Sequence, residues 1–119
     1  DYQGKEKSLW PELTTLYPPR ADQPTQQELV DRLMFIQANE AARCFEENVV
    51  RSVADANIGS IFGWGFAPHQ GGALQFINAM GVQRFVARSR ELARQHGARF
   101  EPAAILVQMA QENRRFEDA

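Results

Sequence analysis

The sequence predicts an all-α domain of about five helices, and three observations lead to that fold class. The first is a series of apolar residues at steps of three and four, which is typical of an amphipathic helix: Leu29, Val30, Leu33, Met34, Ala38, Ala41 and Phe45. The second is the repeated pairing of helix start signals with glycine stop signals along the chain. The third is that no run of four or more residues alternates convincingly between turn signals, so no sheet is predicted.

Bulk properties narrow the class of protein. A chain of 119 residues fits one domain, and 13 Lys+Arg against 15 Asp+Glu give a net charge of −2, which argues against a general nucleic-acid binder. No apolar run approaches the ~20 residues that span a bilayer, and no signal-peptide pattern opens the chain. The single Cys44 cannot form a disulfide within the chain, which favours a reducing, cytoplasmic setting. One Cys and two widely separated His are too few ligands for a structural zinc site, so no metal site is predicted. Because Asp1 comes first, we expect a piece of a longer chain.

Residues 1–24 are predicted to form an extended connector arm, and residues 25–119 a helical domain. Four prolines interrupt the arm, each restricting the backbone: Pro11, Pro18, Pro19 and Pro24. The arm also carries apolar residues, which indicate that it packs against something: Trp10, Leu13, Leu16 and Tyr17.

The first predicted helix, roughly 25–48, opens on a capping box. Thr25 is expected to accept from a first-turn amide while Glu28 reaches back to the cap. Gln37 lies near the middle of the apolar arc and Glu40 near its edge. We expect both to tether a loop or a helix end, rather than to act as a general base, because an unpaired buried polar group is costly.

Four shorter helices follow. A second capping signal at 52–55 opens a helix that Gly63 ends, with apolar residues Ile58, Ile61 and Phe62. The next helix spans 73–80 and ends at Gly81, and another, ending at Gly97, has one face made by Phe85, Val86, Ser89, Leu92, Ala93 and His96. Before the last helix, Pro102 is expected at the first helical position with Phe100 stapled onto Ile105.

The stretch 63–72 reads GWGFAPHQGG and contains four glycines: Gly63, Gly65, Gly71 and Gly72. A dinucleotide fingerprint needs G-x-G-x-x-G between a strand and a helix, whereas here a helix precedes and Pro68 stands at the third glycine position. We therefore expect a corner between two helices, in which Gly63 and Gly65 permit sharp turns and Pro68 stiffens the exit. Trp64 and Phe66 would pack over the neighbouring helices.

Three other candidates have simpler interpretations. His69 has no acid or nucleophile near it in sequence, so a solvated loop residue is favoured over a catalyst. Cys44 is favoured as a packing residue. An arginine series could dock a phosphorylated ligand or an acidic partner, but a solvated helix face is favoured: Arg84, Arg88, Arg90, Arg94 and Arg99.

The ordered motifs resemble the C-terminal domain of L-3-hydroxyacyl-CoA dehydrogenases, most closely the distal copy in bacterial multifunctional fatty-acid β-oxidation enzymes. The opening helices of that family resemble three runs here: Arg32-Leu33-Met34, Asn39-Glu40-Ala41-Ala42-Arg43-Cys44 and Asp55-Ala56-Asn57-Ile58-Gly59. Residues 63–72 are similar to its G-x-G-F/Y-P-x-x-x-G-G/P turn, and 76–81 to its F-x-D-x-x-G helix. A "G-x-R-F-x-P…L…M" ending at 97–109 and a "K-x-L-W-P" connector at 7–11 complete the match. Under this resemblance the structural motif residues are Glu40, Gly63, Gly65, Pro68, Gly71 and Gly72.

The resemblance implies a parent enzyme that oxidises (3S)-3-hydroxyacyl-CoA with NAD, usually alongside an enoyl-CoA hydratase. The catalytic His–Glu pair and the NAD site belong to a preceding Rossmann domain, so the isolated chain is expected to have no catalytic or cofactor-binding residues and to be inactive. Its partners would be that Rossmann domain, the proximal helical copy, the acyl-CoA substrate and, in some assemblies, a thiolase subunit.

One departure concerns the substrate. The substrate-contacting asparagine of the family corresponds to Asp31, whose carboxylate can only accept hydrogen bonds. This change favours an architectural role, with Asp31, Trp64 and Phe66 as the substrate-adjacent candidates. Two alternatives stay open: a stand-alone helical interaction module that uses the Trp64/Phe66 corner and the arginine helix, and a homodimer of the chain through exposed apolar helix faces.

Overall fold

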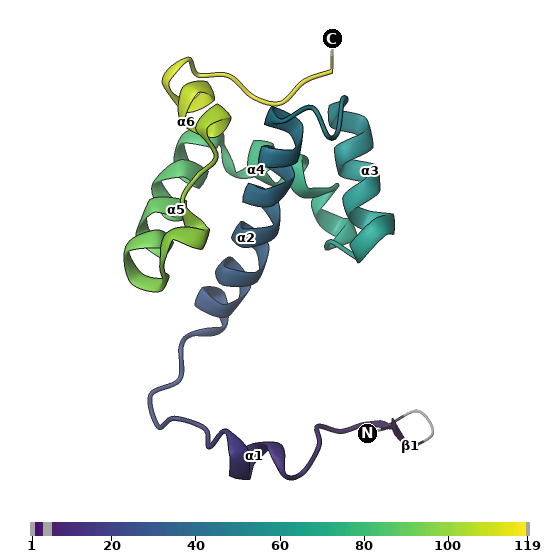
Figure 1. The fold of residues 1–119 in the computed structure, drawn as a ribbon, viewed down its shortest axis with the longest axis vertical. Coiled ribbons are helices and arrows are strands. Elements are labelled where there is room, and N and C mark those ends of the chain that lie inside the picture. Colours follow the sequence, from purple (N-terminus) through teal and green to yellow (C-terminus); the bar gives the residue numbers. More distant parts are fainter. Residues whose placement is uncertain (1, 4–5, 119) are drawn as a thin grey trace.

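The computed structural model describes residues 2–3 and 6–118, which form a helical body and an arm (Figure 1). The all-α prediction is confirmed, with five helices of eight residues or more. These are α2 (Gln26–Glu46), α3 (Val53–Trp64), α4 (Ala73–Met80), α5 (Val82–His96) and α6 (Ala104–Gln111). Single 3₁₀ turns lie at Pro68–Gln70 and Ala98–Phe100. Within the described residues, no helix has the length and apolar character needed to cross a membrane.

Helix α2 runs through the middle of the body, between α3 on one side and α5 and α6 on the other (Figure 1). Thr25 caps its start, since its hydroxyl accepts from the Glu28 amide at 3.2 Å. The second half of the predicted capping box is wrong. The Glu28 carboxylate turns instead toward Arg88 and His96, whose cationic or N–H groups bind it better than one backbone amide does.

Aromatic rings from three helices form the centre of the core. Phe35 of α2 stacks on Phe85 of α5, with ring centroids 4.4 Å apart and an interplanar angle of 2°. Phe76 of α4 meets both rings edge-on, at 5.8 Å from Phe35 and 6.1 Å from Phe85. Such pairs contribute about 0.5–1.5 kcal/mol beyond their area burial. Phe66, just after α3, is 1% exposed and contacts Phe76 from the other side.

The buried face of α2 differs from the predicted apolar arc. The structure buries Phe35, Ala38, Asn39, Ala41 and Ala42. Leu29, Val30 and Leu33 face outward instead. Apolar residues lie on both sides of this helix, so the periodicity alone does not decide which side meets the core.

A buried polar contact was missed by the sequence reasoning. Asn39, which is fully buried, donates from Nδ2 to Ser89 Oγ at 3.1 Å and to the Phe100 carbonyl at 3.4 Å. It thereby joins α2 to α5 and to the turn that follows α5. Its spacing from Phe35 and Ala42 on one helical face was the available signal.

Distant side chains bind the first amides of two helices, α6, which has no local side-chain cap, and α3, which Ser52 also caps. Helix α6 begins at Ala104, so the expected place of Pro102 at the first helical position is wrong; Pro102 lies two residues earlier. The Glu46 carboxylate at the end of α2 accepts from the Ile105 amide at 2.8 Å and supplies a cap. Asp118 likewise accepts from the Val53 and Ala54 amides at the start of α3, at 2.5 and 2.9 Å.

The tail after α6 returns across the body and ends near the start of α3 (Figure 1). Phe116 is buried, and its ring meets Phe45 edge-on at 5.6 Å. Its backbone is bonded in both directions by the Asn78 amide, which accepts at 2.9 Å and donates at 2.8 Å. The tail therefore links α2, α3 and α4.

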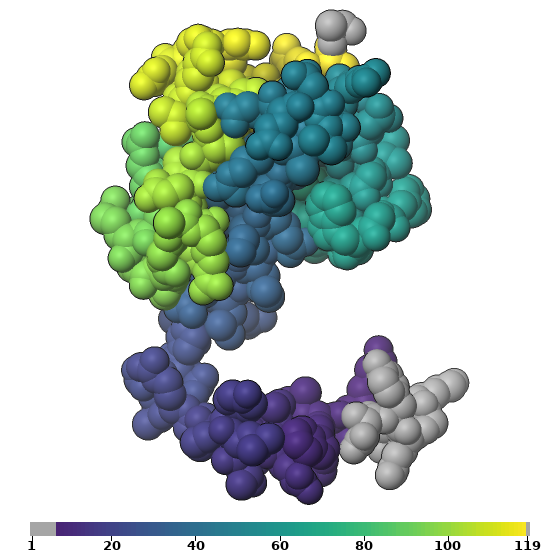
Figure 2. Space-filling view, in the orientation of Figure 1, coloured from purple at the N-terminus to yellow at the C-terminus, as the bar shows by residue number. Residues whose placement is uncertain are grey.

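Figure 2 shows the arm projecting from the body rather than lying on it. The arm contains one short helix, α1 (Leu13–Leu16), and two short strands, β1 (Tyr2–Gln3) and β2 (Glu6–Lys7). These strands pair antiparallel over two residues, so the expectation of no sheet is wrong at this point. Of the apolar residues expected to pack, Trp10, Leu16 and Tyr17 are exposed and Leu13 is half-buried; Leu9 is also exposed, at 78%. The predicted packing of the arm is therefore not made within this chain.

Candidate functional site

The corner between α3 and α4 begins two residues later than predicted. Gly63 remains helical, and α3 continues to Trp64. The helix ends at Gly65, which adopts a left-handed conformation with φ of 78°, while the Phe66 amide bonds back to the Ser60 carbonyl at 3.0 Å. Gly63 as the helix stop is thus wrong, because Gly65 satisfies the backbone requirement two residues further on.

The second half of the corner is fixed by a close approach of two backbones. A Cβ atom on Gly72 would lie 2.5 Å from the Asn57 Cα, and the φ of Gly72 is 109°. This approach lets α3 cap α4: the Asn57 Oδ1 accepts from the Gln75 amide at 2.9 Å, and the Ser60 Oγ accepts from the Ala73 amide at 3.0 Å. Gly71, with φ of 77°, ends the 3₁₀ turn that Pro68 begins.

The two aromatic residues of the corner have separate positions. Phe66 belongs to the core, whereas Trp64 lies at the surface, 55% exposed, and donates from Nε1 to the Gln37 Oε1 at 3.0 Å. Gln37 also donates to the Leu33 carbonyl of its own helix at 2.8 Å. Gln37 therefore tethers the end of α3 to α2 through its hydrogen bond with Trp64, as its predicted role requires.

Other sequence candidates lie at the surface. Glu40 is exposed and pairs with Arg43 of its own helix at 3.1 Å, so its predicted tethering of a loop or helix end is wrong. His69 is exposed on the 3₁₀ turn, with a ring nitrogen 3.3 Å from the Gln70 amide nitrogen. Ile58 and Phe62 of α3 also face outward, and Phe62 is 86% exposed. Within the described residues, no group of three or more His, Cys, Asp and Glu is arranged to hold a metal ion.

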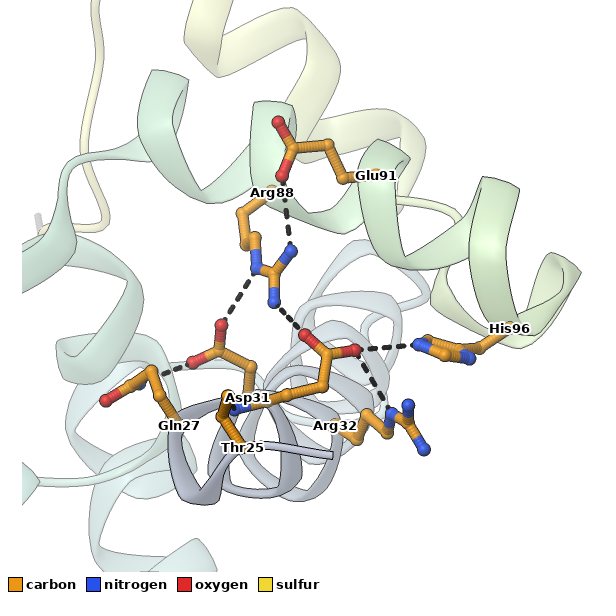
Figure 3. Close-up of polar contacts among 8 residues, drawn as sticks. Thr25, Gln27, Asp31, Arg32, Arg88, Glu91 and His96 are labelled. Atoms are coloured by element: carbon orange, nitrogen blue, oxygen red, sulfur yellow. Dashed lines mark hydrogen bonds and ion pairs between the residues drawn. The ribbon is translucent and has the colours of Figure 1, made fainter. Parts of the chain in front are cut away.

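A charged cluster joins the first turns of α2 to α5 (Figure 3). The Arg88 guanidinium contacts three carboxylates: Glu28 at 2.5 Å, Asp31 at 2.8 Å and Glu91 at 3.2 Å. The Asp31 carboxylate, whose side chain is 13% exposed, also accepts from Gln27 at 2.7 Å. Arg88 is therefore engaged within the chain and differs from the other residues of the arginine series, since Arg84, Arg90, Arg94 and Arg99 are exposed.

Glu28 is the most strongly held member of the charged cluster. His96 Nε2 lies 2.7 Å from one of its oxygens, and Arg32 contacts the same oxygen at 3.2 Å. The hydrogen bonds from His96 and then from Arg88 lower the pKa of the Glu28 carboxyl from 4.5 to about 2. The cluster is an ion-pair crosslink, and its carboxylates and cations are matched with one another.

An apolar groove lies between α2 and α3, with a volume of about 560 Å³. Ala41 and Cys44 line one wall, and Gly59 and Gly63 line the other, with Trp64 beside them. Cys44 is half-buried, as expected of a packing residue, but it lines the groove and does not belong to the buried core.

No model of a known protein family matches the chain.

Two glycine substitutions at the corner are expected to act in opposite directions. Gly72→Ala should lower the free energy of unfolding by about 2–4 kcal/mol, because the new methyl meets the Asn57 backbone and the φ is positive. Gly63→Ala should raise it by about 0.5–1 kcal/mol, since Gly63 is helical and a Cβ there has nothing within 4 Å. Urea denaturation at neutral pH measures both. A Gly72→Ala variant as stable as the wild-type chain, or a Gly63→Ala variant less stable than it, would contradict this geometry.

The charged cluster predicts a pH-dependent stability. Because the pKa of Glu28 is lowered on folding, its contribution is complete above pH 4.5 and is lost as the pH falls from 4.5 toward 2. Glu28→Gln should cost about 1–2 kcal/mol at neutral pH, allowing for the partial exposure of the cluster, and the difference from the wild-type chain should shrink over that window. Denaturant unfolding at a series of pH values measures this, with Glu47→Gln, an exposed carboxylate, as the control. A difference that stays constant down to pH 2 would argue against the crosslink.

Proposed function

We propose that the chain is the C-terminal helical domain, in its distal copy, of an NAD-dependent (3S)-3-hydroxyacyl-CoA dehydrogenase from a bacterial multifunctional β-oxidation enzyme, and that its role is architectural. The observation that carries this proposal is that the motif residues have structural tasks. Gly65 ends α3, Gly72 admits Asn57, and Asn57 caps α4. A motif retained for such a corner indicates the origin of the domain rather than a reaction centre.

The environment of Asp31 supports an architectural role. Both of its carboxylate oxygens have partners within the chain, Arg88 for one and Gln27 for the other. An ionised carboxylate cannot donate to a thioester or keto oxygen, and here it is committed to an ion pair. Phe66, the other motif residue considered beside the substrate, lies in the core, so Trp64 is the one of the three that has an exposed surface for a neighbouring group.

The position of the corner glycines argues against a dinucleotide site there. Gly63 and Gly65 stand at the carboxyl end of α3, where backbone carbonyls rather than amides are left unpaired, which suits a cation better than a pyrophosphate. No reaction step is therefore assigned to this chain, and NAD would be held by the preceding Rossmann domain.

The exposed apolar surface supports a neighbouring domain. Leu29, Val30 and Leu33 form an outward-facing patch on the first half of α2. Contiguous apolar patches of this kind mark interaction surfaces in folded proteins. We propose that the Rossmann domain and the proximal helical copy cover this patch in a cytoplasmic parent enzyme that binds acyl-CoA and can join a thiolase subunit.

The isolated chain is expected to show no NADH-dependent reduction of acetoacetyl-CoA. The reaction needs an acid–base pair and a bound dinucleotide, and this proposal assigns both to another domain. NADH absorbance measures the rate, with a buffer blank as the control. Turnover above the blank that His69→Ala abolishes would contradict the architectural role.

A stand-alone helical interaction module is the second candidate, and the exposure of Phe62 and Trp64 on α3 favours it. The reading frame that encodes the chain distinguishes the two. A hydratase-like segment and a strand–G-x-G-x-x-G–helix upstream support the dehydrogenase origin, whereas a start codon beside Asp1 supports the module.

A further inference from the structure

The apolar groove opens on the surface, and its lining is mostly apolar. Two exposed carboxylate residues, Glu40 and Asp55, also line it, while its other polar side chains are engaged within the chain. Its Ser60 hydroxyl donates to the Asn57 carbonyl at 2.8 Å and accepts from the Ala73 amide. Its Gln37 amide is bonded to Leu33 and Trp64. Small-molecule sites use a few converging polar groups to orient the ligand, so these walls suit apolar side chains better than a polar metabolite.

Two glycines of the groove have no explanation within the chain. Gly59 is an interior residue of α3 and Gly63 lies in its last turn, and a Cβ atom on either would meet nothing within 4 Å. Glycine in a helix interior is destabilising relative to alanine, and no internal contact here requires it. Both glycines line the groove, so they leave this wall open to a group that approaches from outside the body.

The arm offers a matching set of apolar side chains. Leu9, Trp10, Leu16 and Tyr17 are exposed and lie within nine residues of one another. Pro18, Pro19 and Pro24 separate them from α2 and stiffen the connection, which holds the arm away from its own body (Figure 2). We propose that the apolar groove of one chain receives the arm of a second copy, and that two chains exchange arms reciprocally.

The area available is enough for a stable dimer. Covering the exposed parts of these four side chains removes on the order of 400–500 Å² per arm from water, given that a large aromatic side chain buries roughly 150–250 Å². Two arms and the groove surfaces that they cover give roughly 1,800 Å², within the ~1,200–2,000 Å² of specific protein interfaces. Ile58 and Phe62 of the same helix, α3, are also exposed. This inference concerns the chain by itself and does not rest on its enzymatic origin.

Sedimentation equilibrium of the full chain over a wide concentration range tests the exchange, and a monomer–dimer equilibrium is expected. An arm variant, Trp10→Ser with Leu16→Ser, and a groove variant, Gly59→Leu, should each weaken the dimer at least ~tenfold. Both change exposed or open positions, so the fold is retained, and Gly59→Leu should not lower the midpoint of urea unfolding. Matched controls are Thr14→Ser with Thr15→Ser on the arm and Ala87→Leu on the exposed face of α5, and these should leave the dimer unchanged.

Mixing the two variants separates arm exchange from other dimers. The groove variant has an intact arm and the arm variant has an intact groove, so the mixture can form one arm–groove contact. A heterodimer tighter than either homodimer is therefore expected. Recovery of no heterodimer, a wild-type chain that is monomeric at every concentration, or a dimer indifferent to the arm substitutions would each overturn the proposal.

Discussion

The stacking of Phe35 on Phe85 is the contact on which the rest of the body depends. It joins the central helix α2 to α5, and Phe76 fixes α4 against both rings. Once these three helices are in place, α3 is positioned through its caps on α4, and α6 through the Glu46 carboxylate. The tail completes the arrangement by pairing Phe116 with Asn78.

Because α2 commits one side to this aromatic centre, its other side is left for different contacts. Near the start of α2, the charged cluster ties Glu28 and Asp31 to Arg88 on α5. Beyond it, the helix is separated from α3 by the apolar groove, where α3 presents glycines instead of large side chains. The body is thus well packed around the phenylalanines and incomplete between α2 and α3. That incompleteness is the physical basis of the proposed arm exchange, whereas the proposed neighbouring domain is argued from the exposed patch of Leu29, Val30 and Leu33 on α2.

Local signals in the sequence predicted the helices well. Thr25 and Ser52 cap helices as expected, and Gly81 and Gly97 end them, because these preferences depend on residues one to four apart. The orientation of α2 could not be obtained in this way, since both of its faces carry apolar residues. Gly63 and Gly65 have similar intrinsic preferences, so local sequence does not choose between them; in the structure α3 ends at Gly65, directly before the buried Phe66.

Contacts between distant residues account for most of the remainder. Asp118 caps a helix that begins 65 residues earlier, and Arg88 meets acids on another helix, and neither follows from local pattern. For the candidate site, the corner was located from its glycines, whereas the groove was not anticipated. The groove is lined on α3 by small residues, whose local sequence pattern predicts only a helix. Its presence depends on the spacing between α3 and α2, which local pattern does not give.

A double-mutant cycle on Phe35 and Phe85 tests the central contact most directly. Phe35→Leu, Phe85→Leu and the double variant would be compared by urea denaturation, with leucine chosen to keep the core apolar. We expect a coupling energy of about 0.5–1.5 kcal/mol between the two rings, and a single cooperative loss of helix in every variant. Additivity within about 0.3 kcal/mol, or separate unfolding of α5 from α2, would contradict the dependence of the fold on this stack.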